Sequence, residues 1–520
     1  MELGRLDLIV LFAYFAAVVA VGFWFGRTER DTRDYFLGGK RQHWLVVGLS
    51  IVATEVSALT FINVPADAFW GDWTYLQMYA GAMLGRLVIV FLFLPAFYGG
   101  DVTTVYEYLG QRFGPRTRTT ASVMFVASRI IGSGIRLLAA SLAIAAVFGW
   151  PLTWVVLAGA GAAIAYATFG GIKAIIWTDA LQALVFLAGG VGVVVFLFLS
   201  IPGGWGENLS SAYGAGKLHT FTWGGSLNNE KLFWVLLVSA TFQNCAALGV
   251  DQDLTQRMLT CPDVRHGQRS LIFNMLVGLP VVCLFLLIGT LMALYLGGSS
   301  GAALPVEIPD KSDRVFPYFI AYMLPSGYGL KGLLVAGIFA ASMSSLDSAL
   351  GALSSTAVTD FYRPFILRRR LLPAPRRKGG FLPPGGESGQ AKARGSGDLR
   401  VARMFTLLFG VLLAGVALAF AGNDRLLWET FKWVGLIFGG MLGVFLLGVT
   451  TSRRGRDGVN TLAMVSSVGV LVAIKVVQEQ AGVVYIAWPW WVVIGTAWTY
   501  VIGACFATRR VQHGEPRMAD

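Results

Sequence analysis

The sequence predicts an all-α protein that crosses a membrane many times, and three observations support this fold class. The 520-residue chain is 55% hydrophobic and only 13% charged, which is too little polar surface for a water-soluble protein. Its apolar residues come in long blocks, and a helix needs roughly 20 such residues to cross a bilayer. Lys and Arg gather in alternate connecting segments. Because backbone polar groups in hydrocarbon must pair within their own segment, these blocks are expected to be spanning helices.

We expect about thirteen spanning helices in one transmembrane domain over residues 1–510. In chain order they cover 8–26, 44–69, 74–98, 118–148, 151–169, 173–200, 231–259, 270–298, 327–361, 400–422, 426–449, 459–479 and 487–507. A stretch of about 30 apolar residues fits either one tilted helix or a helix with a short cap.

The basic residues indicate the orientation in the membrane. If the N-terminus is outside, the Lys- and Arg-rich segments, such as 27–43 and 362–399, face the cytoplasm, whereas 299–326 is acidic. This positive-inside asymmetry predicts a multi-pass protein of the inner (plasma) membrane with a cytoplasmic tail at 508–520. The Arg-, Pro- and Gly-rich segment 362–399 is expected to be a disordered loop beside anionic membrane lipids. The net charge of +12 therefore requires no nucleic-acid partner.

Two predicted spans are interrupted by polar and small residues. The second span breaks between Ala53 and Thr60, and the seventh contains Gln243, Asn244 and Gly249. Interruptions at corresponding positions five helices apart are typical of inverted-repeat transporters, in which unwound carbonyls face a site at the bilayer midplane. Polar residues that only hold packed helices together are the alternative interpretation.

A serine-rich face of the ninth span has the spacing of a cation site. Ala341, Ser344 and Ser345 lie at i, i+3 and i+4, so they share one face of a helix. Hard cations take oxygen ligands, about six in number, and two hydroxyls and one carbonyl supply half of such a shell. The break in the second span would supply further carbonyls at Ala53 and Val56.

The chain resembles the sodium:solute symporter family over roughly residues 5–510. The segments that carry the resemblance are YFLGGKRQHWLVVGLSIVATEVSALTFINVPADAF (35–69), GGIKAIIWTDALQ (170–182), DQDLTQRML (251–259) and LVAGIFAASMSSLDSALGALSSTAVTDFY (334–362). The resemblance implies a LeuT-type fold with two inverted five-helix repeats, at approximately 44–200 and 231–449. It also implies sodium-coupled import of a small organic solute by alternating access, with Na+ as the co-transported ion.

The resemblance places the main sodium site on five residues. They are the carbonyls of Ala53, Val56 and Ala341 and the hydroxyls of Ser344 and Ser345.

A second cation site is expected around Asp179, because a carboxylate within the membrane is costly unless it has a function or a partner. In the sialic acid symporters of this family, hydroxyls on the ninth span help to complete such a site, and the matching positions are Ser344, Asp347 and Ser348. Asp347 stands where a hydroxyl is expected, so it either strengthens the cation site, binds a proton or pairs with an Arg. Glu55 lies beside the helix break, and we expect it to act in coupling, either on the ion pathway or as a partner of the unwound backbone.

The candidate substrate ligands are polar residues expected to face the midplane. They are Ser57, Thr60, Gln77, Arg136 and Asn244. The Arg136 guanidinium suits bidentate binding of a carboxylate, which favours a sialic acid, a sugar acid or a monocarboxylate as substrate. Its pairing with Glu55 or Asp67 is the alternative, and a neutral sugar remains a competing substrate.

Other functional classes are less well supported. The chain contains four histidines without metal-binding spacing, and it has no P-loop, so neither an enzyme nor a primary pump is predicted. A transporter-like sensor would carry an output domain after the last span, where only residues 508–520 follow. The sensor and a proton-coupled symporter remain the alternatives, and the oligomeric state is not determined.

Overall fold

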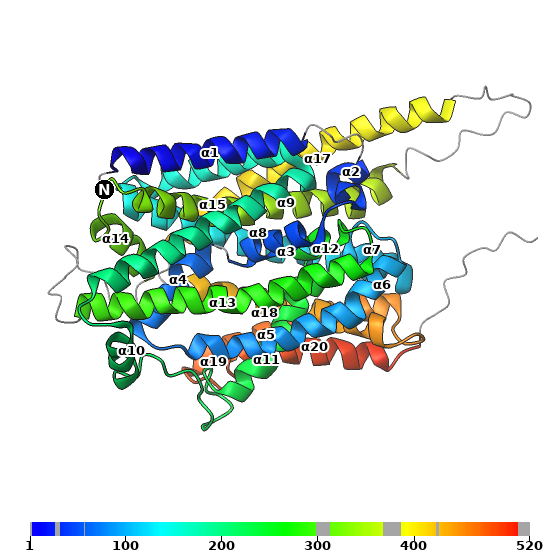
Figure 1. Cartoon of the computed structure of the whole chain (residues 1–520). Coiled ribbons are helices and arrows are strands. Elements are labelled where there is room, and N and C mark those ends of the chain that lie inside the picture. Colours follow the sequence, from blue (N-terminus) through cyan, green and yellow to red (C-terminus); the bar gives the residue numbers. More distant parts are fainter. Residues whose placement is uncertain are drawn as a thin grey trace, which may run out of the picture.

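The computed structural model describes residues 3–26, 32–56, 58–297, 313–367, 386–422 and 426–507. Within these residues the only β-pairing is an isolated bridge between Arg454 and Ala507. All other regular structure is helical, so the predicted all-α class is confirmed. The long helices run side by side along one common direction (Figure 1).

Every predicted span is helical, either as one helix, as consecutive helices or as part of the long helix α9. In chain order these are α1 (Arg5–Gly26), α3 (Trp44–Glu55) with α4 (Ala58–Trp70), α5 (Gln77–Val88) with η3 (Ile89–Phe93) and α6 (Leu94–Gly99), α8 (Pro115–Phe148), α9 (Leu152–Ser200), α11 (Phe233–Gly249) with α12 (Gln252–Leu259), α13 (Val264–Gly297), α15 (Leu330–Thr356) with η4 (Ala357–Leu367), α17 (Gly386–Ala419), α18 (Leu426–Thr450), α19 (Asp457–Ala481) and α20 (Pro489–Ala504). The short helices between them are α2 (Thr32–Leu37), η1 (Gly38–Lys40), η2 (Thr74–Leu76), α7 (Val105–Arg112), α10 (Trp205–Gly214) and α14 (Val315–Tyr322).

Helix length and composition agree with only part of the predicted number of spans. Among the described residues, eight helices are long and apolar enough to cross a bilayer, and two bent pairs reach that length together. Helix α9 contains two predicted spans, which meet at Gly171 with a φ of 46°. Glycine adopts this left-handed conformation without a Cβ clash. The count of thirteen stays a prediction.

Both predicted helix breaks are present, although one lies later than expected. Helices α3 and α4 meet at 55°, and α11 and α12 meet at 60°. The first break follows Glu55 and so lies within the predicted interval between Ala53 and Thr60. The second comes at Val250, so Gln243 and Asn244 lie inside the continuous helix α11 and not in the break. Asp251 ends the break by capping α12, because its side chain accepts a hydrogen bond from the Asp253 amide.

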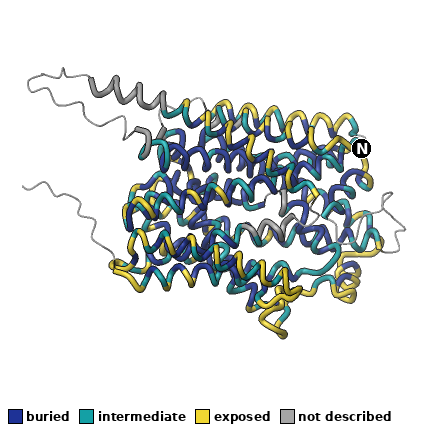
Figure 2. The backbone as a smooth tube through the Cα atoms, turned by 180° about the vertical axis from the view of Figure 1, so that it is seen from behind, coloured by how far each residue is buried: buried dark blue, intermediate teal, exposed yellow. Residues whose placement is uncertain are grey.

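The buried residues lie in the middle of the helix bundle, whereas the outer helices carry exposed side chains (Figure 2). Many of these exposed side chains are large and apolar, for example Phe12 on α1, Trp154 on α9 and Leu462 on α19, which are about two-thirds exposed. Apolar outer surfaces of this kind are suited to contact with lipid hydrocarbon.

The connecting segments separate into two groups at opposite ends of the bundle. Helices α10 and α14 lie near the N-terminus of α1, whereas α2 and α7 lie at the other end (Figure 1). This separation agrees with the predicted alternation of the loops. The loop predicted at 362–399 is shorter than expected, because η4 continues to Leu367 and α17 begins at Gly386. Residues 368–385 and the predicted tail at 508–520 lie outside the described residues.

Candidate functional site

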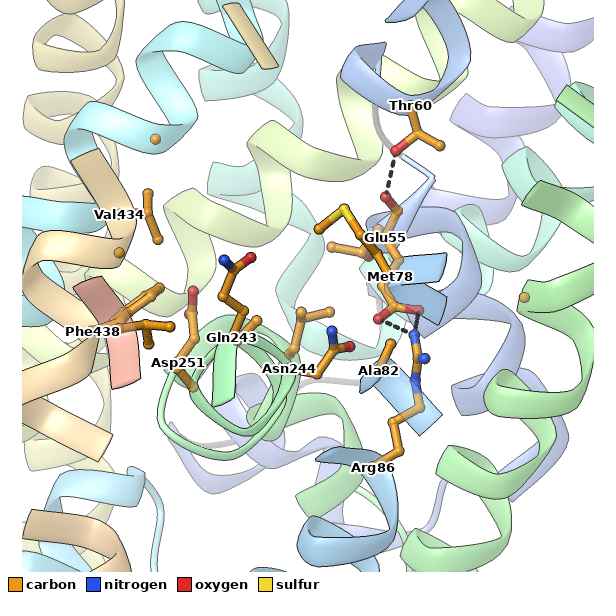
Figure 3. A pocket seen from close by; sticks show the side chains of 18 of the residues that line it. Glu55, Thr60, Met78, Ala82, Arg86, Gln243, Asn244, Asp251, Val434 and Phe438 are labelled. Atoms are coloured by element: carbon orange, nitrogen blue, oxygen red, sulfur yellow. Dashed lines mark hydrogen bonds and ion pairs between the residues drawn. The ribbon is translucent and has the colours of Figure 1, made fainter. Parts of the chain in front are cut away.

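A cavity of about 250 Å³ lies beside both helix breaks. Residues of α3, α5, α8, α11 and α18 line it, and Figure 3 shows Glu55 and Arg86 on one side with Asp251 and Val434 on the other. Small and apolar side chains line much of the rest, including Ala82. Such a mixture of apolar walls and a few polar groups is typical of small-molecule sites.

Five side chains of the acidic and basic residue types line this cavity. They are Glu55, Arg86, Arg129, Arg136 and Asp251. With two carboxylates and three guanidiniums in their ordinary charge states, the lining carries one net positive charge.

Glu55 and Arg86 form a closed network with Asn274. Arg86 Nη2 donates to both carboxylate oxygens of Glu55, at 2.8 and 2.9 Å. Arg86 Nε donates to the side-chain oxygen of Asn274 at 3.1 Å, and the Asn274 amide donates to Glu55 at 2.8 Å. The Arg86 side chain is 4% exposed and that of Glu55 is 22% exposed. Glu55 therefore pairs with α5 and α13, and not with Arg136.

Arg129 is also paired with carboxylates. Its guanidinium forms an ion pair with Asp251 at 2.9 Å and a second one with Asp253. Asp253 in turn pairs with Arg257 at 2.6 Å, and Arg257 pairs with Asp179 at 2.9 Å. Opposite charges thus alternate from the cavity toward Asp179 on α9, which lowers the cost of burying them in the protein interior.

Arg136 has no such partner. It lies on α8, seven residues after Arg129, and lines the cavity. No hydrogen bond or ion pair joins its guanidinium to any described residue, and its Nε is buried without a partner. The alternatives that pair Arg136 with Glu55 or Asp67 are therefore not supported. Arg136 thus lines the cavity without an ion pair to any described carboxylate.

The predicted main sodium ligands are brought together from α3 and α15. Ser344 Oγ lies 3.2 Å from the Ala53 carbonyl oxygen and 3.5 Å from that of Ala341. Ser345 Oγ lies 3.2 Å from the Ala341 carbonyl oxygen. Val56 directly follows α3 with a ψ of 66°, so its carbonyl leaves the helical direction. The last carbonyls of a helix lack intrahelical partners and carry partial negative charge, which suits a cation.

The predicted second cation site is more crowded. Asp179 accepts hydrogen bonds from Ser50 at 2.7 Å and from Arg257 at 2.9 Å, so a guanidinium already balances its charge. Asp347 accepts from the Ser348 amide at 2.6 Å, and Ser348 Oγ donates to Asp253 at 3.4 Å. One carboxylate oxygen of Asp179 and one of Asp347 have no hydrogen-bond partner among the described residues.

The remaining substrate candidates separate into three cases. Thr60 and Asn244 line the cavity, and Thr60 Oγ1 donates to the Glu55 carbonyl at 3.1 Å. Gln77 does not line it, because its buried amide donates to the Lys231 carbonyl at 3.0 Å and accepts from the backbone of the outer segment. The prediction that Gln77 binds substrate is thus not supported by its position in this structure. Ser57 lies outside the described residues.

Sequence analysis did not identify Arg86, Asn274 and Arg129 as parts of the site. The signal was present for both arginines, because each is a charged residue within a predicted span, as Arg136 is. Asn274 gave no comparable signal, since a single amide in a spanning helix often only supports packing.

Comparisons with known proteins place this arrangement in context. A model of the sodium:solute symporter family matches residues 35–370. The chain is 29% identical to the sodium/sialic acid symporter SiaT of Proteus mirabilis (strain HI4320), over 91% of this chain and 90% of that protein. It is 28% identical to the human sodium-coupled monocarboxylate transporter 2, over 85% of this chain and 68% of that protein.

A solved structure shares the overall architecture. It is described as a substrate-bound outward-open state of a Na+-coupled sialic acid symporter with a novel Na+ site. The two chains are 26% identical with a TM-score of 0.80, and the match covers 97% of this chain and 98% of the other.

Proposed function

Because this chain belongs to the sodium:solute symporter family, we propose that it couples the inward movement of sodium to the import of a small, singly charged organic acid by alternating access. Family members are membrane transporters and not enzymes. The driving force is adequate in principle, since one charge that crosses 100 mV supplies about 2.3 kcal/mol.

The unpaired guanidinium of Arg136 is the observation that carries the substrate proposal. Glu55 is neutralised by Arg86, and Asp251 by Arg129. Of the three arginines that line the cavity, only Arg136 has no carboxylate partner among the described residues. An uncompensated charge in a membrane interior is costly, so a carboxylate on the substrate would balance it. The planar guanidinium also matches a carboxylate in a bidentate geometry.

Sodium is the second cargo in this proposal. The carbonyls of Ala53, Val56 and Ala341 and the hydroxyls of Ser344 and Ser345 would bind it. The two hydroxyls now donate to carbonyl oxygens. They would rotate so that their lone pairs face the cation, which converts neutral hydrogen bonds into ion–dipole contacts.

The break between α3 and α4 is the element that would couple the two cargoes. It supplies Ala53 and Val56 to the sodium site and Thr60 to the cavity. Bound sodium would hold this irregular backbone in one conformation. The conformational-entropy cost of substrate binding would then be smaller, so the two ligands would bind with positive cooperativity. By thermodynamic linkage, the substrate would increase the affinity for sodium by the same factor.

A second cation would bind between Asp179, Asp347 and Ser348. The two carboxylate oxygens without hydrogen-bond partners support this assignment. Arg257 competes with the cation for Asp179. Occupancy of this site would therefore depend on how strongly the Arg257 guanidinium pairs with Asp179.

The proposed orientation has the N-terminus outside the cell and the C-terminus in the cytoplasm. The basic segments support it through the positive-inside asymmetry. The protein would lie in the inner (plasma) membrane, in contact with lipids along its apolar outer surface.

Uptake into proteoliposomes tests the substrate proposal. Labelled acids and their neutral amides would be compared with and without an inward sodium gradient. Wild-type protein should transport acids only when sodium is present. Arg136→Lys should raise the KM for acids by at least about 10-fold, because lysine keeps the charge but loses the bidentate geometry, a loss of about 1.5–3 kcal/mol.

The neutral amides serve as the internal control for this variant. Transport of amides or parent sugars by wild-type protein at rates equal to those of the acids would contradict the proposal. A uniform loss of transport for acids and neutral solutes in Arg136→Lys would instead assign Arg136 a structural role.

A further inference from the structure

Arginine side chains gather where α7, the start of α8 and the α18–α19 loop meet. Arg112 Nη2, at the end of α7, donates to the loop carbonyls of Thr451 at 2.8 Å and of Arg454 at 3.3 Å. The Asp457 carboxylate, at the start of α19, accepts from the backbone amides of Arg116 and Thr117 at 3.2 and 2.7 Å. These contacts bring together the members of an arginine cluster, which are Arg112, Arg116, Arg453, Arg454 and Arg456.

Three guanidiniums of the arginine cluster are exposed and have no acidic partner. They belong to Arg116, Arg453 and Arg456, and no hydrogen bond or ion pair joins these side chains to a described residue. The nearby Asp457 carboxylate accepts hydrogen bonds from the first turn of α8. Even with this carboxylate included, the cluster carries a net charge of +4 when all six groups are in their ordinary charge states. The surface therefore attracts anions.

An apolar surface adjoins the arginine cluster. The Gly455 amide donates to the Phe506 carbonyl at 2.8 Å, so the α18–α19 loop is attached to the chain that follows α20. The Phe506 side chain is 45% exposed, Val501 on α20 is 58% exposed, and Leu462 on α19 is 67% exposed. Exposed apolar side chains on spanning helices are suited to lipid hydrocarbon. The charged surface thus lies beside a surface for acyl chains.

An anionic phospholipid matches both surfaces. Its phosphodiester carries a negative charge and presents oxygen acceptors, and the planar guanidinium binds phosphate oxygens in a bidentate geometry. Its acyl chains would cover the apolar side chains at the same time. A free phosphate ion would use only the arginines, and a zwitterionic lipid would bring a positive choline close to them.

We propose that the arginine cluster binds the phosphodiester headgroup of an anionic phospholipid, whose acyl chains lie against α19 and α20. The site is at the end of the bundle that holds α7 and lies opposite the N-terminus (Figure 1). The bound lipid would connect the start of α8, which carries Arg136 in the cavity, with the end of α18, which carries Val434 there. We therefore expect it to stabilise the helices around the cavity. The inference does not depend on the identity of the transported solute.

Thermal unfolding of the full-length protein in a nonionic detergent tests the site. The probes are dioleoylphosphatidylglycerol, dioleoylphosphatidylcholine, which has the same acyl chains and no net charge, and inorganic phosphate. Each basic residue near the surface strengthens binding of anionic lipid about fivefold, so three free guanidiniums predict a preference of roughly 100-fold for phosphatidylglycerol over phosphatidylcholine. Inorganic phosphate should stabilise the protein only at concentrations at least about 10-fold higher than phosphatidylglycerol, because it gains nothing from the apolar surface.

A triple variant removes the three free guanidiniums, with Arg116→Gln, Arg453→Gln and Arg456→Gln. It should lose at least about 10-fold of the preference for phosphatidylglycerol. The matched control removes the same charge from exposed arginines of α13 and α17 outside the cluster, with Arg265→Gln, Arg269→Gln and Arg400→Gln. It should keep the preference. A salt titration of the wild type gives a second measurement, and the preference should fall as the Debye length shrinks from about 10 Å at 0.1 M to about 3 Å at 1 M.

Four results would overturn the proposal. The first is equal stabilisation of the wild type by phosphatidylglycerol and phosphatidylcholine, which decides the matter even if the triple variant does not fold. The second is an unchanged preference in a folded triple variant. The third is an equal loss in the control, which would show that total charge acts and not this cluster. The fourth is inorganic phosphate as effective as phosphatidylglycerol, which would identify a site for free anions. None of these results bears on the proposed sodium-coupled uptake, which the proteoliposome assay tests separately.

Discussion

Removal of the Ser344 hydroxyl provides a direct test of the sodium site. Ser344 is fully buried on α15, and its Oγ lies 3.2 Å from the Ala53 carbonyl oxygen across the interface with α3. Ser344→Ala removes a single oxygen and changes little of the packing. The substitution therefore separates ligation from folding.

The expected magnitude follows from the change in the contacts. Without sodium, the variant loses one neutral hydrogen bond, which is worth about 1 kcal/mol of stability. With sodium, it loses one ligand to a charge, and hydrogen bonds to charged groups are worth about 1.5–3 kcal/mol. The sodium-bound state therefore loses about 0.5–2 kcal/mol more than the sodium-free state, and the sodium concentration for half-maximal uptake should rise roughly 2- to 30-fold. Replacement of both Ser344 and Ser345 by alanine should abolish sodium-coupled uptake in a folded protein.

The assay is initial uptake into proteoliposomes across a series of external sodium concentrations. Ser342→Ala is the matched control, because Ser342 is also buried on α15 but lies two residues away and thus on a different face of the helix. Unchanged sodium activation in Ser344→Ala would refute the assignment. Equal changes in Ser344→Ala and Ser342→Ala would show that the effect comes from packing.

Further predictions concern the second cation site and the helix packing. The wild-type sodium Hill coefficient should exceed one, and Asp347→Asn should lower it toward one; a wild-type value of one would remove the second site. Asp179→Asn should lower it as well, with some loss of stability because Arg257 loses one of its two carboxylate partners and keeps Asp253. Gly289→Ala should lower the melting temperature by overpacking, a cost of about 1–3 kcal/mol, because a Cβ there would overlap the Pro65 carbonyl. Gly415→Ala meets nothing within 4 Å and should be neutral; an equal effect of both would contradict this account.

Hydropathy and spacing were sufficient to predict the all-α class and a helix break between Ala53 and Thr60, whereas the main sodium face stays a prediction. The LeuT-type class agrees with the similarity to a solved sialic acid symporter structure. These features are local, since a spanning helix is determined by its own apolar length and backbone pairing. The face shared by Ala341, Ser344 and Ser345 follows from helical periodicity alone.

The positions of other residues depended on the packing of distant segments. The break in α11–α12 comes after Gly249, because Asp251 caps the following helix. Gln77 has the polarity expected of a substrate ligand, yet the outer segment that folds over α5 uses its hydrogen bonds. Neither the Asp251 cap nor the hydrogen bonds of Gln77 can be predicted from the residue types of the local segment.

The need of each buried charge for a partner follows from the sequence, whereas the choice of partner follows from the tertiary structure. The membrane interior requires that Glu55, Arg86, Arg129 and Arg136 find partners, and this requirement can be inferred from the sequence. Which partner each one takes depends on which helices lie side by side. Glu55 on α3 pairs with Arg86 on α5 because both helices pack against α13, and the break before α12 places Asp251 beside Arg129 on α8. Both carboxylates that line the cavity, Glu55 and Asp251, therefore pair with other arginines. Arg136 lines the same cavity without an ion pair to a described residue.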